Sequence, residues 1–377
     1  MRSARNAARR LVLPCLAALM CTLLVAPVRA DLRTRNVILV TLDGLRIQDF
    51  FRGMDADIAA YQEQHDEYAE IAEMREQFWR DTPEQRRAAL MPFFWQQLAP
   101  MGVVFGNKDK GSNVQVRNAV RWSSPGYAEI MTGQPQAEVV DNTLVRYPHP
   151  TVMEYVQSAL HLDHARVAEI GSWDGFSTAA ASSADRFVMV GAQELIPPDL
   201  STPELDLLGQ LRREVMELWE EGSNDALTYR MAEGYLRMQQ PRLLWIALSQ
   251  SDDWAHAGRY DRLLAYMHLA DDFLRRLWGT LQSLDAYRDK TTLIITTDHG
   301  RGLTPADWLE HDASVPGSED IWLAVIGPDT PHRGEVAPSA TFHQSDIAAT
   351  LLQFFGLDYR DFNVAAGPPI PGTLHQP

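Results

Sequence analysis

The sequence predicts an α/β protein with a mostly parallel central sheet that is covered by helices on both faces. Short apolar runs rich in β-branched residues recur along the chain and alternate with segments of helical periodicity. This alternation is typical of parallel sheets buried on both sides. Several of the runs are followed closely by an aspartate, and the carboxyl ends of parallel strands face the ligand crevice in such folds. The 377 residues, 45% hydrophobic and 22% charged, suit one large globular domain.

The first thirty residues differ from the rest of the chain. Several arginines are followed by an apolar stretch from Leu11 to Val25, and the segment closes with "PVRA", ending at Ala30. This pattern is typical of a secretory signal peptide over residues 1–30, cleaved near Ala30, which leaves a mature domain over 31–377. The expected location is therefore the periplasm or the extracellular medium. An uncleaved anchor is the alternative, although the run is short for a stable membrane span.

Charge and cysteine content narrow the possible partners. Cys15 and Cys21 both lie in the leader, so the mature chain is expected to contain no disulfide and no thiolate ligand. The leader holds five arginines and no acid, so its removal would move the formal charge from −16 to −21. Such an acidic protein is not expected to bind a nucleic-acid polymer. An anionic substrate would have to be attracted locally, for example by metal ions.

Five apolar runs are predicted to be buried strands of the sheet. They are 36–44, 165–173, 243–250, 291–300 and 321–328. Helical patterns lie between them, as in "HPTVMEYVQSAL" and "DIAATLLQFFG".

Two polar stretches, 51–100 and 201–240, interrupt the pattern and are predicted to be helical insertions. In the first, Thr82, Pro83 and Gln85 have the spacing of a capping box with proline at the first helical position. The second opens on the similar pair Thr202-Pro203. The insertions would either form a lid or wall beside the crevice or cover an edge of the sheet.

Acids and imidazoles follow the ends of the predicted strands. The run "LIITTDHGRG" ends in Asp298 and His299, and "VTLDGLR" places Asp43 in a glycine-assisted turn. In "SQSDDWAHAG", Asp252 and His256 are four residues apart, so one helical turn would put both on one face. Each motif taken singly is ordinary turn or surface chemistry.

Together with His343, which stands just before the helical stretch "SDIAATLLQFFG", these residues make three carboxylates and three imidazoles. This set divides naturally into two metal sites with nitrogen and oxygen ligands and no sulfur. Such ligands favour two Zn²⁺ ions, with Mn²⁺ or iron as alternatives.

The segment "RWSSPGYAEIMTG" supplies a candidate nucleophile. Ser123 lies at the amino end of a predicted helix, where backbone N–H groups and the helix dipole favour an oxyanion. Ordinary capping of a helix by serine is the alternative.

In order and spacing, these motifs resemble the alkaline phosphatase superfamily of binuclear metallohydrolases, in particular its nucleotide pyrophosphatase/phosphodiesterase-like branch. The resemblance spans nearly the whole mature chain and implies an alkaline-phosphatase-like fold. It implies one metal held by Asp252, His256 and His343. The other would be held by Asp43, Asp298, His299 and the Ser123 oxygen.

The resemblance also implies catalytic roles. Ser123 would be the nucleophile, and Asn142 in "EVVDN" would bind a phosphoryl oxygen together with the backbone N–H of Ser124. Sulfatases of the superfamily carry Cys/Ser-x-Pro-x-Arg, but Tyr127 stands at the position of that arginine.

The sequence therefore predicts an exported hydrolase of small anionic phosphoric esters that acts through a phosphoseryl intermediate on Ser123. Alternatives are a phospho-group transferase, a sulfatase-like hydrolase of the same superfamily, and a noncatalytic metal-binding protein. Trp173 and Asp174 are candidates for the crevice rim. His311 could reach the substrate or a metal, although a place in a surface loop is the simpler expectation.

Overall fold

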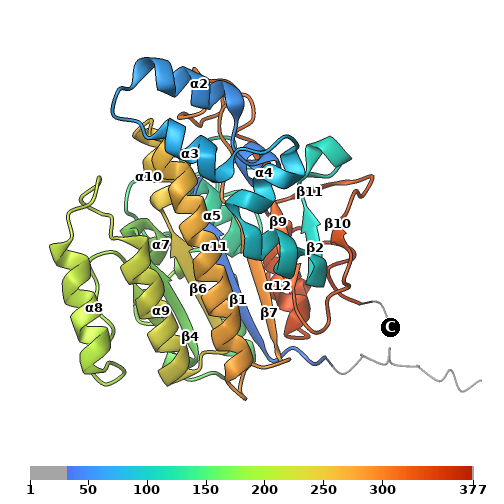
Figure 1. The fold of residues 1–377 in the computed structure, drawn as a ribbon. Helices are drawn as coiled ribbons and strands as arrows, with labels where there is room; N and C mark the ends of the chain where they lie inside the picture. Colours follow the sequence, from blue (N-terminus) through green and yellow to red (C-terminus); the bar gives the residue numbers. More distant parts are fainter. Residues whose placement is uncertain (1–31, 376–377) are drawn as a thin grey trace, which may run out of the picture. The chain divides into compact units, whose positions relative to one another are not determined.

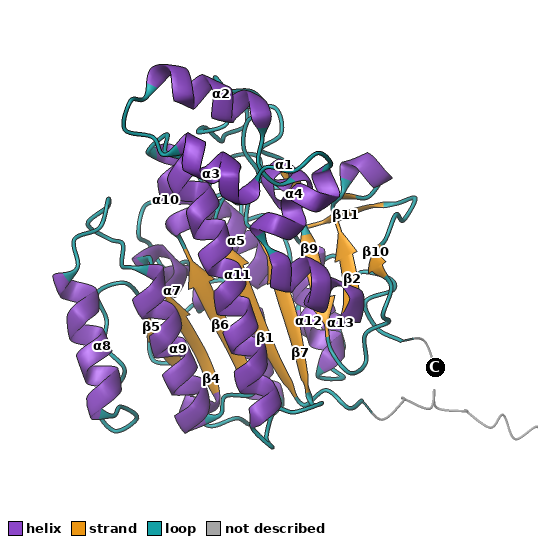
Figure 2. Cartoon of the chain, viewed as in Figure 1, coloured by secondary structure: helices purple, strands orange, loops and turns teal. Residues whose placement is uncertain are grey.

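The computed structural model describes residues 32–375, so the predicted leader lies outside the described residues. Two sheets organise this part of the chain (Figures 1 and 2). The larger sheet has the strand order β10 (Gly334–Glu335), β2 (Gly102–Phe105), β9 (Leu323–Ile326), β7 (Thr291–Thr296), β1 (Asn36–Leu42), β6 (Leu243–Leu248), β4 (Val167–Gly171) and β5 (Val188–Val190). The smaller sheet has the order β11 (Thr341–His343), β3 (Asn113–Gln115) and β8 (Asp320–Ile321).

Strands β7, β1, β6, β4 and β5 are all parallel, which confirms the predicted sheet. Four of them lie within predicted runs, whereas β5 is too short to show a pattern in the sequence. The last predicted run, 321–328, contains part of β8 and then β9, and β9 is antiparallel to β7. The smaller sheet was not predicted, because its strands have only two or three residues.

Helices cover both faces of the sheet. Alternate residues of β1 point to opposite sides: Ile38 and Val40 join the apolar core under α9 and α11, whereas Val37 and Leu39 join the core under α5, α6 and α12. In Figure 1, α9 and α11 lie in front of the strands. The α-helices are α1 (Ile47–Arg52), α2 (Ala56–His65), α3 (Ile71–Phe78), α4 (Pro83–Leu90), α5 (Ser123–Thr132), α6 (Val152–Ala159), α7 (Asp174–Ala180), α8 (Pro203–Glu214), α9 (Asp225–Gln239), α10 (Gln250–His256), α11 (Tyr260–Ser283), α12 (Asp346–Phe354) and α13 (Tyr359–Phe362). Shorter helical turns are η1 (Phe94–Leu98), η2 (Ala99–Met101), η3 (Lys108–Lys110) and η4 (His164–Arg166). None of the helices in residues 32–375 is both long and apolar enough to cross a bilayer.

The first insertion forms α2, α3, α4 and η1, and these elements pack around α11. The capping box of Thr82 and Gln85 is present at the start of α4. Asp271 on α11 accepts the backbone N–H groups of Phe93 and Phe94, both at 2.7 Å, and so satisfies donors at the start of η1. This insertion therefore completes the core on one face of the sheet.

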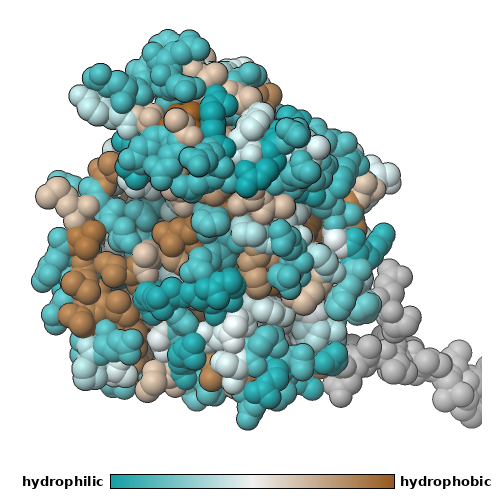
Figure 3. All heavy atoms as spheres, in the orientation of Figure 1, coloured by the Kyte–Doolittle hydropathy of each residue, from teal (hydrophilic) through white to brown (hydrophobic). Residues whose placement is uncertain are grey.

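The second insertion forms α8 and α9, joined by a loop. Arg212 of α8 is buried and donates to the carbonyl oxygens of Gly171 and Gly191, at the ends of β4 and β5. It thereby holds the insertion against the carboxyl edge of the sheet. On the outer side, Leu207 and Met238 are exposed, and Figure 3 shows the apolar surface that gathers over this region.

Glu335 on β10 ties the first insertion to the edge of the sheet. Arg87 of α4 donates to both of its carboxylate oxygens, at 2.9 and 2.7 Å, and Lys110 and Asn107 add hydrogen bonds of 2.6 Å each. Burial would raise the pKa of Glu335, but these hydrogen bonds outweigh it and lower the pKa to about 2. The charged form is therefore favoured in the folded state.

We predict that Glu335→Gln lowers the free energy of unfolding at pH 7 by about 1–3 kcal/mol. Since the folded pKa is depressed, the stabilisation is present above the unfolded pKa near 4.3 and is lost as the pH falls toward 2. Urea unfolding of both proteins from pH 7 to pH 3 measures this, and Glu214→Gln, an exposed change on α8, is the control. A difference that stays constant over this range would contradict the prediction.

Candidate metal centre

Three neighbouring parallel strands deliver the predicted acids to one edge of the sheet. Asp43 follows β1, Asp298 follows β7, and Asp252 lies in the first turn of α10 directly after β6. The register places Leu42 opposite Leu248 and Thr41 opposite Thr296, so the three strands end at nearly the same level. The predicted convergence of these carboxylates therefore follows from strand order and register.

Asp43, Asp298 and His299 form the first group of candidate ligands, and all three are buried. The His299 Nε2 atom is 3.5 Å from Asp43 Oδ1 and 3.3 Å from Asp298 Oδ2. One ligand atom from each residue can be chosen so that all lie within 4.8 Å of one another. This spacing suits three ligands of one cation.

Asp252, His256 and His311 form the second group. The spacing of Asp252 and His256 on one turn of α10 brings His256 Nε2 to 3.2 Å from Asp252 Oδ2. The Nε2 atoms of His256 and His311 are 3.0 Å apart. The two groups adjoin, because His299 Nε2 is 3.8 Å from Asp252 Oδ1 and the rings of His299 and His311 stack at 3.7 Å.

Neither candidate group includes His343, which the resemblance placed with Asp252 and His256. His343 is half-buried in β11 of the smaller sheet, paired with Gln115, and its backbone N–H donates to Asp346 at 2.8 Å. Among the described residues, the third member of the group with Asp252 and His256 is His311. His311 is only 8% exposed, so the expectation of a surface position was wrong.

Backbone carbonyls orient two of the imidazoles. His299 Nδ1 lies 3.0 Å from the carbonyl oxygen of Gly300, and His311 Nδ1 lies 2.8 Å from that of Arg121. Since a carbonyl can only accept, each Nδ1 carries the proton and each Nε2 keeps its lone pair. Such an outer hydrogen bond is the usual partner of a metal-binding histidine.

The pKa shifts of five of the six groups fit a divalent cation. Burial raises the pKa of Asp43 well above its usual value, and the negative charge of Asp298 adds to this. Burial likewise raises the pKa of Asp298 and lowers those of His299, His256 and His311. The imidazoles are therefore held neutral, as ligands must be, and the carboxylates lack a sufficient counter-charge.

An unpaired carboxylate oxygen of Asp298 also indicates a cation site. Asp298 Oδ1 accepts the backbone N–H of Gly44 at 2.9 Å, but its buried Oδ2 has no hydrogen-bond partner. An isolated buried carboxylate oxygen is costly, and a cation at this position would satisfy it. The donor set, of nitrogen and oxygen without sulfur, fits two divalent ions such as zinc.

Arg301 also belongs to the site, although the sequence did not predict it there. Its buried guanidinium donates to Asp252 Oδ1 and, at 2.6 Å, to the carbonyl oxygen of Leu309. Burial lowers its pKa to about 9, so it stays charged at neutral pH. It links the ligand Asp252 to the loop that carries His311, and its only signal in the sequence was its position directly after "DHG".

Ser123 lies where the first group meets the cleft. It is the first residue of α5, and its Oγ is 3.4 Å from both Asp43 Oδ1 and His299 Nε2. Tyr127, one turn later, donates its hydroxyl to Asp43 Oδ2 at 3.1 Å. The position that holds arginine in sulfatases is thus used here to orient a candidate metal ligand.

Asn142 is oriented by the backbone beside Ser123. Its Oδ1 accepts the N–H of Ser124 at 3.0 Å, which leaves the Nδ2 donors available to a bound molecule. The expectation that the Ser124 N–H itself binds substrate is not supported, because this donor is already engaged. Both Asn142 and Ser123 line the same cleft.

The cleft has a volume of about 420 Å³. Its floor includes Asp43, Ser123, Asp252 and His256. Leu144 and Asp253 also line it, and Trp173, Trp219, Glu221 and Gly222 form what we call its outer wall. The second insertion is therefore a wall of the cleft, and the expected rim position of Trp173 agrees with the structure.

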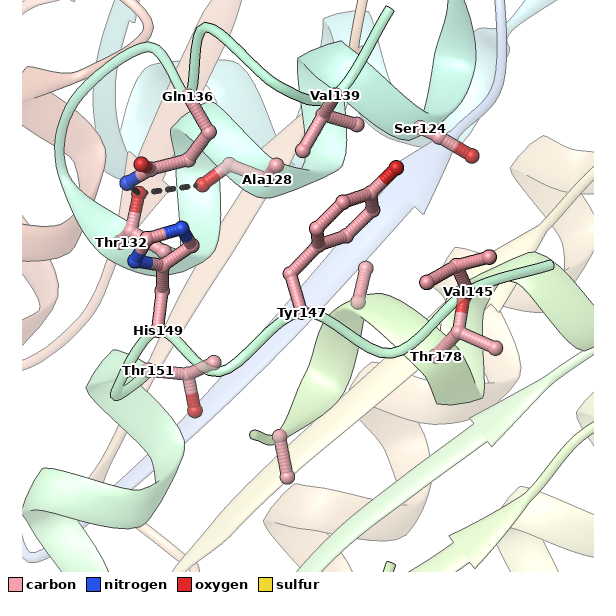
Figure 4. Close-up of a pocket in the computed structure, with 12 residues that line it drawn as sticks. Ser124, Ala128, Thr132, Gln136, Val139, Val145, Tyr147, His149, Thr151 and Thr178 are labelled. Atoms are coloured by element: carbon pink, nitrogen blue, oxygen red, sulfur yellow. Dashed lines mark hydrogen bonds between the residues drawn. The ribbon is translucent and has the colours of Figure 1, made fainter. Parts of the chain in front are cut away.

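A smaller cavity of about 30 Å³ lies on the other side of Ser124 (Figure 4). Figure 4 shows the Tyr147 ring projecting into this space, with Val139 and Val145 around it. His149 Nε2 forms a hydrogen bond with Glu138 Oε1 nearby. These contacts close the segment that carries Asn142 onto the face of α5.

Comparison with known proteins bears on the fold. No protein-family model and no curated sequence matches the chain. A crystal structure of a variant of the alkaline phosphatase PafA superposes with a TM-score of 0.58 at 11% identity, over 91% of this chain and 99% of the other. The chain has an alkaline-phosphatase-like fold.

Two further structures of this kind match less completely. The lipoteichoic acid synthase LtaP from Listeria monocytogenes gives a TM-score of 0.54 at 11% identity, over 86% of this chain and 72% of its own. A candidate sulfatase from Bacteroides thetaiotaomicron gives 0.54 at 13% identity, over 86% and 71%. Because these neighbours have different activities, the fold does not decide between phosphate and sulfate esters.

We predict that His311→Ala loses about one of two bound metal equivalents, because it removes one of three ligands from the second group. His343→Ala should keep both equivalents. Metal analysis after equilibration with Zn²⁺ at a fixed free concentration measures the difference. The opposite pattern, with metal lost from His343→Ala and kept by His311→Ala, would support His343 as the third ligand, as the resemblance implied.

Proposed function

We propose that the chain is an exported hydrolase of small phosphoric esters that uses two divalent cations, preferably zinc, and Ser123 as the nucleophile. The observation that carries the proposal is the position of the Ser123 hydroxyl. It lies 3.4 Å from ligand atoms of Asp43 and His299, at the start of α5, and on the floor of the cleft. A hydroxyl beside two ligand groups and open to a cleft has the arrangement of an activated nucleophile.

Two cations held by Asp43, Asp298 and His299 and by Asp252, His256 and His311 would lower the pKa of the Ser123 hydroxyl and offset charge on the phosphoryl oxygens. The Ser123 hydroxyl releases its proton to solvent as Oγ attacks phosphorus in line, the Oγ–P bond forms, and the bond from phosphorus to the leaving oxygen breaks. The leaving alcohol takes up a proton from solvent. Water then cleaves the phosphoserine and restores the hydroxyl.

The remaining groups position the phosphoryl group. Asn142, held through its Oδ1 by the N–H of Ser124, directs its Nδ2 donors at a non-bridging oxygen. The amino end of α5 adds a positive dipole at the same point. Phosphoryl transfer depends mainly on such positioning and charge, so few other side chains are required.

Tyr127 favours phosphate over sulfate esters. The sulfatase motif places an arginine at this position, whereas Tyr127 here is buried and bonded to Asp43. Transfer of the phospho group to an alcohol is the second outcome that the same intermediate allows. An alcohol acceptor added to the assay would reveal it as a new phosphodiester or phosphomonoester product.

We predict that Ser123→Ala keeps both metal equivalents but lowers kcat on aryl phosphate esters by about three orders of magnitude or more, because the attacking oxygen is lost. Matched 4-nitrophenyl phosphate, bis(4-nitrophenyl) phosphate and 4-nitrophenyl sulfate should be compared, with sulfate the slowest.

Ser124→Ala is the matched control for this experiment. The Ser124 Oγ is buried without a hydrogen-bond partner, and alanine keeps the N–H that holds Asn142. This variant should retain most of its activity. Turnover of phosphate esters by Ser123→Ala at a rate close to that of the unaltered protein would refute the role of Ser123.

A further inference from the structure

Backbone hydrogen bonds between two distant segments hold the outer wall of the cleft in place. The backbone of Trp173 forms an antiparallel bridge with Gly222, and the N–H of Asp174 donates to the carbonyl oxygen of Glu221 at 3.2 Å. The N–H of Ser223 donates to the carbonyl oxygen of Ser172 at 2.7 Å. The loop between α8 and α9 is thus docked on the residues that follow β4, which puts Trp219 and Glu221 beside Trp173.

Two tryptophan side chains line this wall. Trp173 is half-buried, packs edge to face on Phe176 with ring centroids 5.4 Å apart, and lies over Gly175, where an added Cβ would meet the indole at 2.2 Å. Trp219 is 51% exposed and lines the cleft from the opposite segment. Indole faces carry negative potential and attract cations more strongly than other aromatic rings.

Carboxylates surround the same space. Glu221 and Asp253 line the cleft. Glu217 lies next to Gly222: its Cβ would be 3.8 Å from a Cβ built on that glycine. Glu217 Oε2 accepts from Gln250, but its buried Oε1 has no hydrogen-bond partner. Among the cleft-lining residues in the described part of the chain, none is a lysine or an arginine. Burial raises the pKa of Asp253 and of Glu217 and disfavours their charged forms, so the exposed Glu221 gives the wall its negative charge.

We propose that one ester substituent of the substrate carries a positively charged ammonium group, which binds between Trp173 and Trp219 beside Glu221. This inference rests on the proposed function, because the phosphoryl group would bind at Ser123 in the same cleft. A substrate with a cationic substituent and an anionic phosphodiester matches both ends of the site. A second anionic substituent would meet carboxylates, and a neutral ring would gain stacking but no charge attraction.

The test compares two diesters that differ only in charge: 4-nitrophenyl phosphocholine and its isostere 4-nitrophenyl 3,3-dimethylbutyl phosphate, in which carbon replaces nitrogen. Hydrolysis of either ester bond is followed by phosphorus NMR with the zinc-loaded protein. We expect kcat/KM for the choline ester to be about tenfold higher. In the inactive Ser123→Ala variant, calorimetry should give a dissociation constant about tenfold lower for the choline ester than for the isostere.

Glu221→Gln and Trp219→Leu should bring this ratio close to one. Glu220→Gln and Met216→Ala are the matched controls, because these neighbours on the same loop are exposed and do not line the cleft, and they should keep the full ratio. Metal content and circular dichroism verify that each variant is folded.

Equal kinetics and equal binding for the two isosteres would overturn the inference and leave the proposed function intact. A preference that survives both Glu221→Gln and Trp219→Leu would overturn it as well. Failure to hydrolyse either diester or bis(4-nitrophenyl) phosphate would instead overturn the proposed function, and the inference with it.

Discussion

The rest of the structure depends on one constraint: three parallel strands that end side by side bring three aspartates together, and two of them, Asp43 and Asp298, are buried. Carboxylates at this distance repel one another, and burial makes their charged forms costly. Arg301 offsets part of the charge through Asp252, but Asp298 Oδ2 has no hydrogen-bond partner. Neutral imidazoles complete both groups. Divalent cations resolve this arrangement most simply, because they satisfy the lone pairs and the charge together.

The same arrangement determines where chemistry can occur. The amino end of α5 lies against the loop of Asp298, so closely that a Cβ on Gly126 would be 2.8 Å from the carbonyl oxygen of that residue. Glycine at this position lets the helix approach and brings Ser123 to the ligand atoms. Tyr127 then reaches Asp43 from the next turn. One helix thus supplies both the candidate nucleophile and a hydrogen bond that orients a ligand.

The sequence sufficed for features with local causes. Long apolar runs predicted the central strands, and acids just beyond them predicted Asp43, Asp252 and Asp298, since parallel strands share an edge. His311 was not favoured because it lies in a loop without periodicity, and its burial depends on packing against His299. His343 was predicted as a ligand from its place before a helix and from the resemblance; it lies on β11, in a separate short sheet that its sequence does not signal. The pairing of Trp173 with the loop after α8 is likewise a contact between distant segments.

The central claim is that six side chains form two adjoining cation sites beside Ser123. Anomalous diffraction from crystals grown with Zn²⁺, with data on both sides of the zinc absorption edge, tests it most directly. The account predicts two peaks about 4 Å apart, one among Asp43, Asp298 and His299 and one among Asp252, His256 and His311, with the Ser123 oxygen next to the first. A single peak elsewhere, or no peak at these residues in fully active protein, would contradict it.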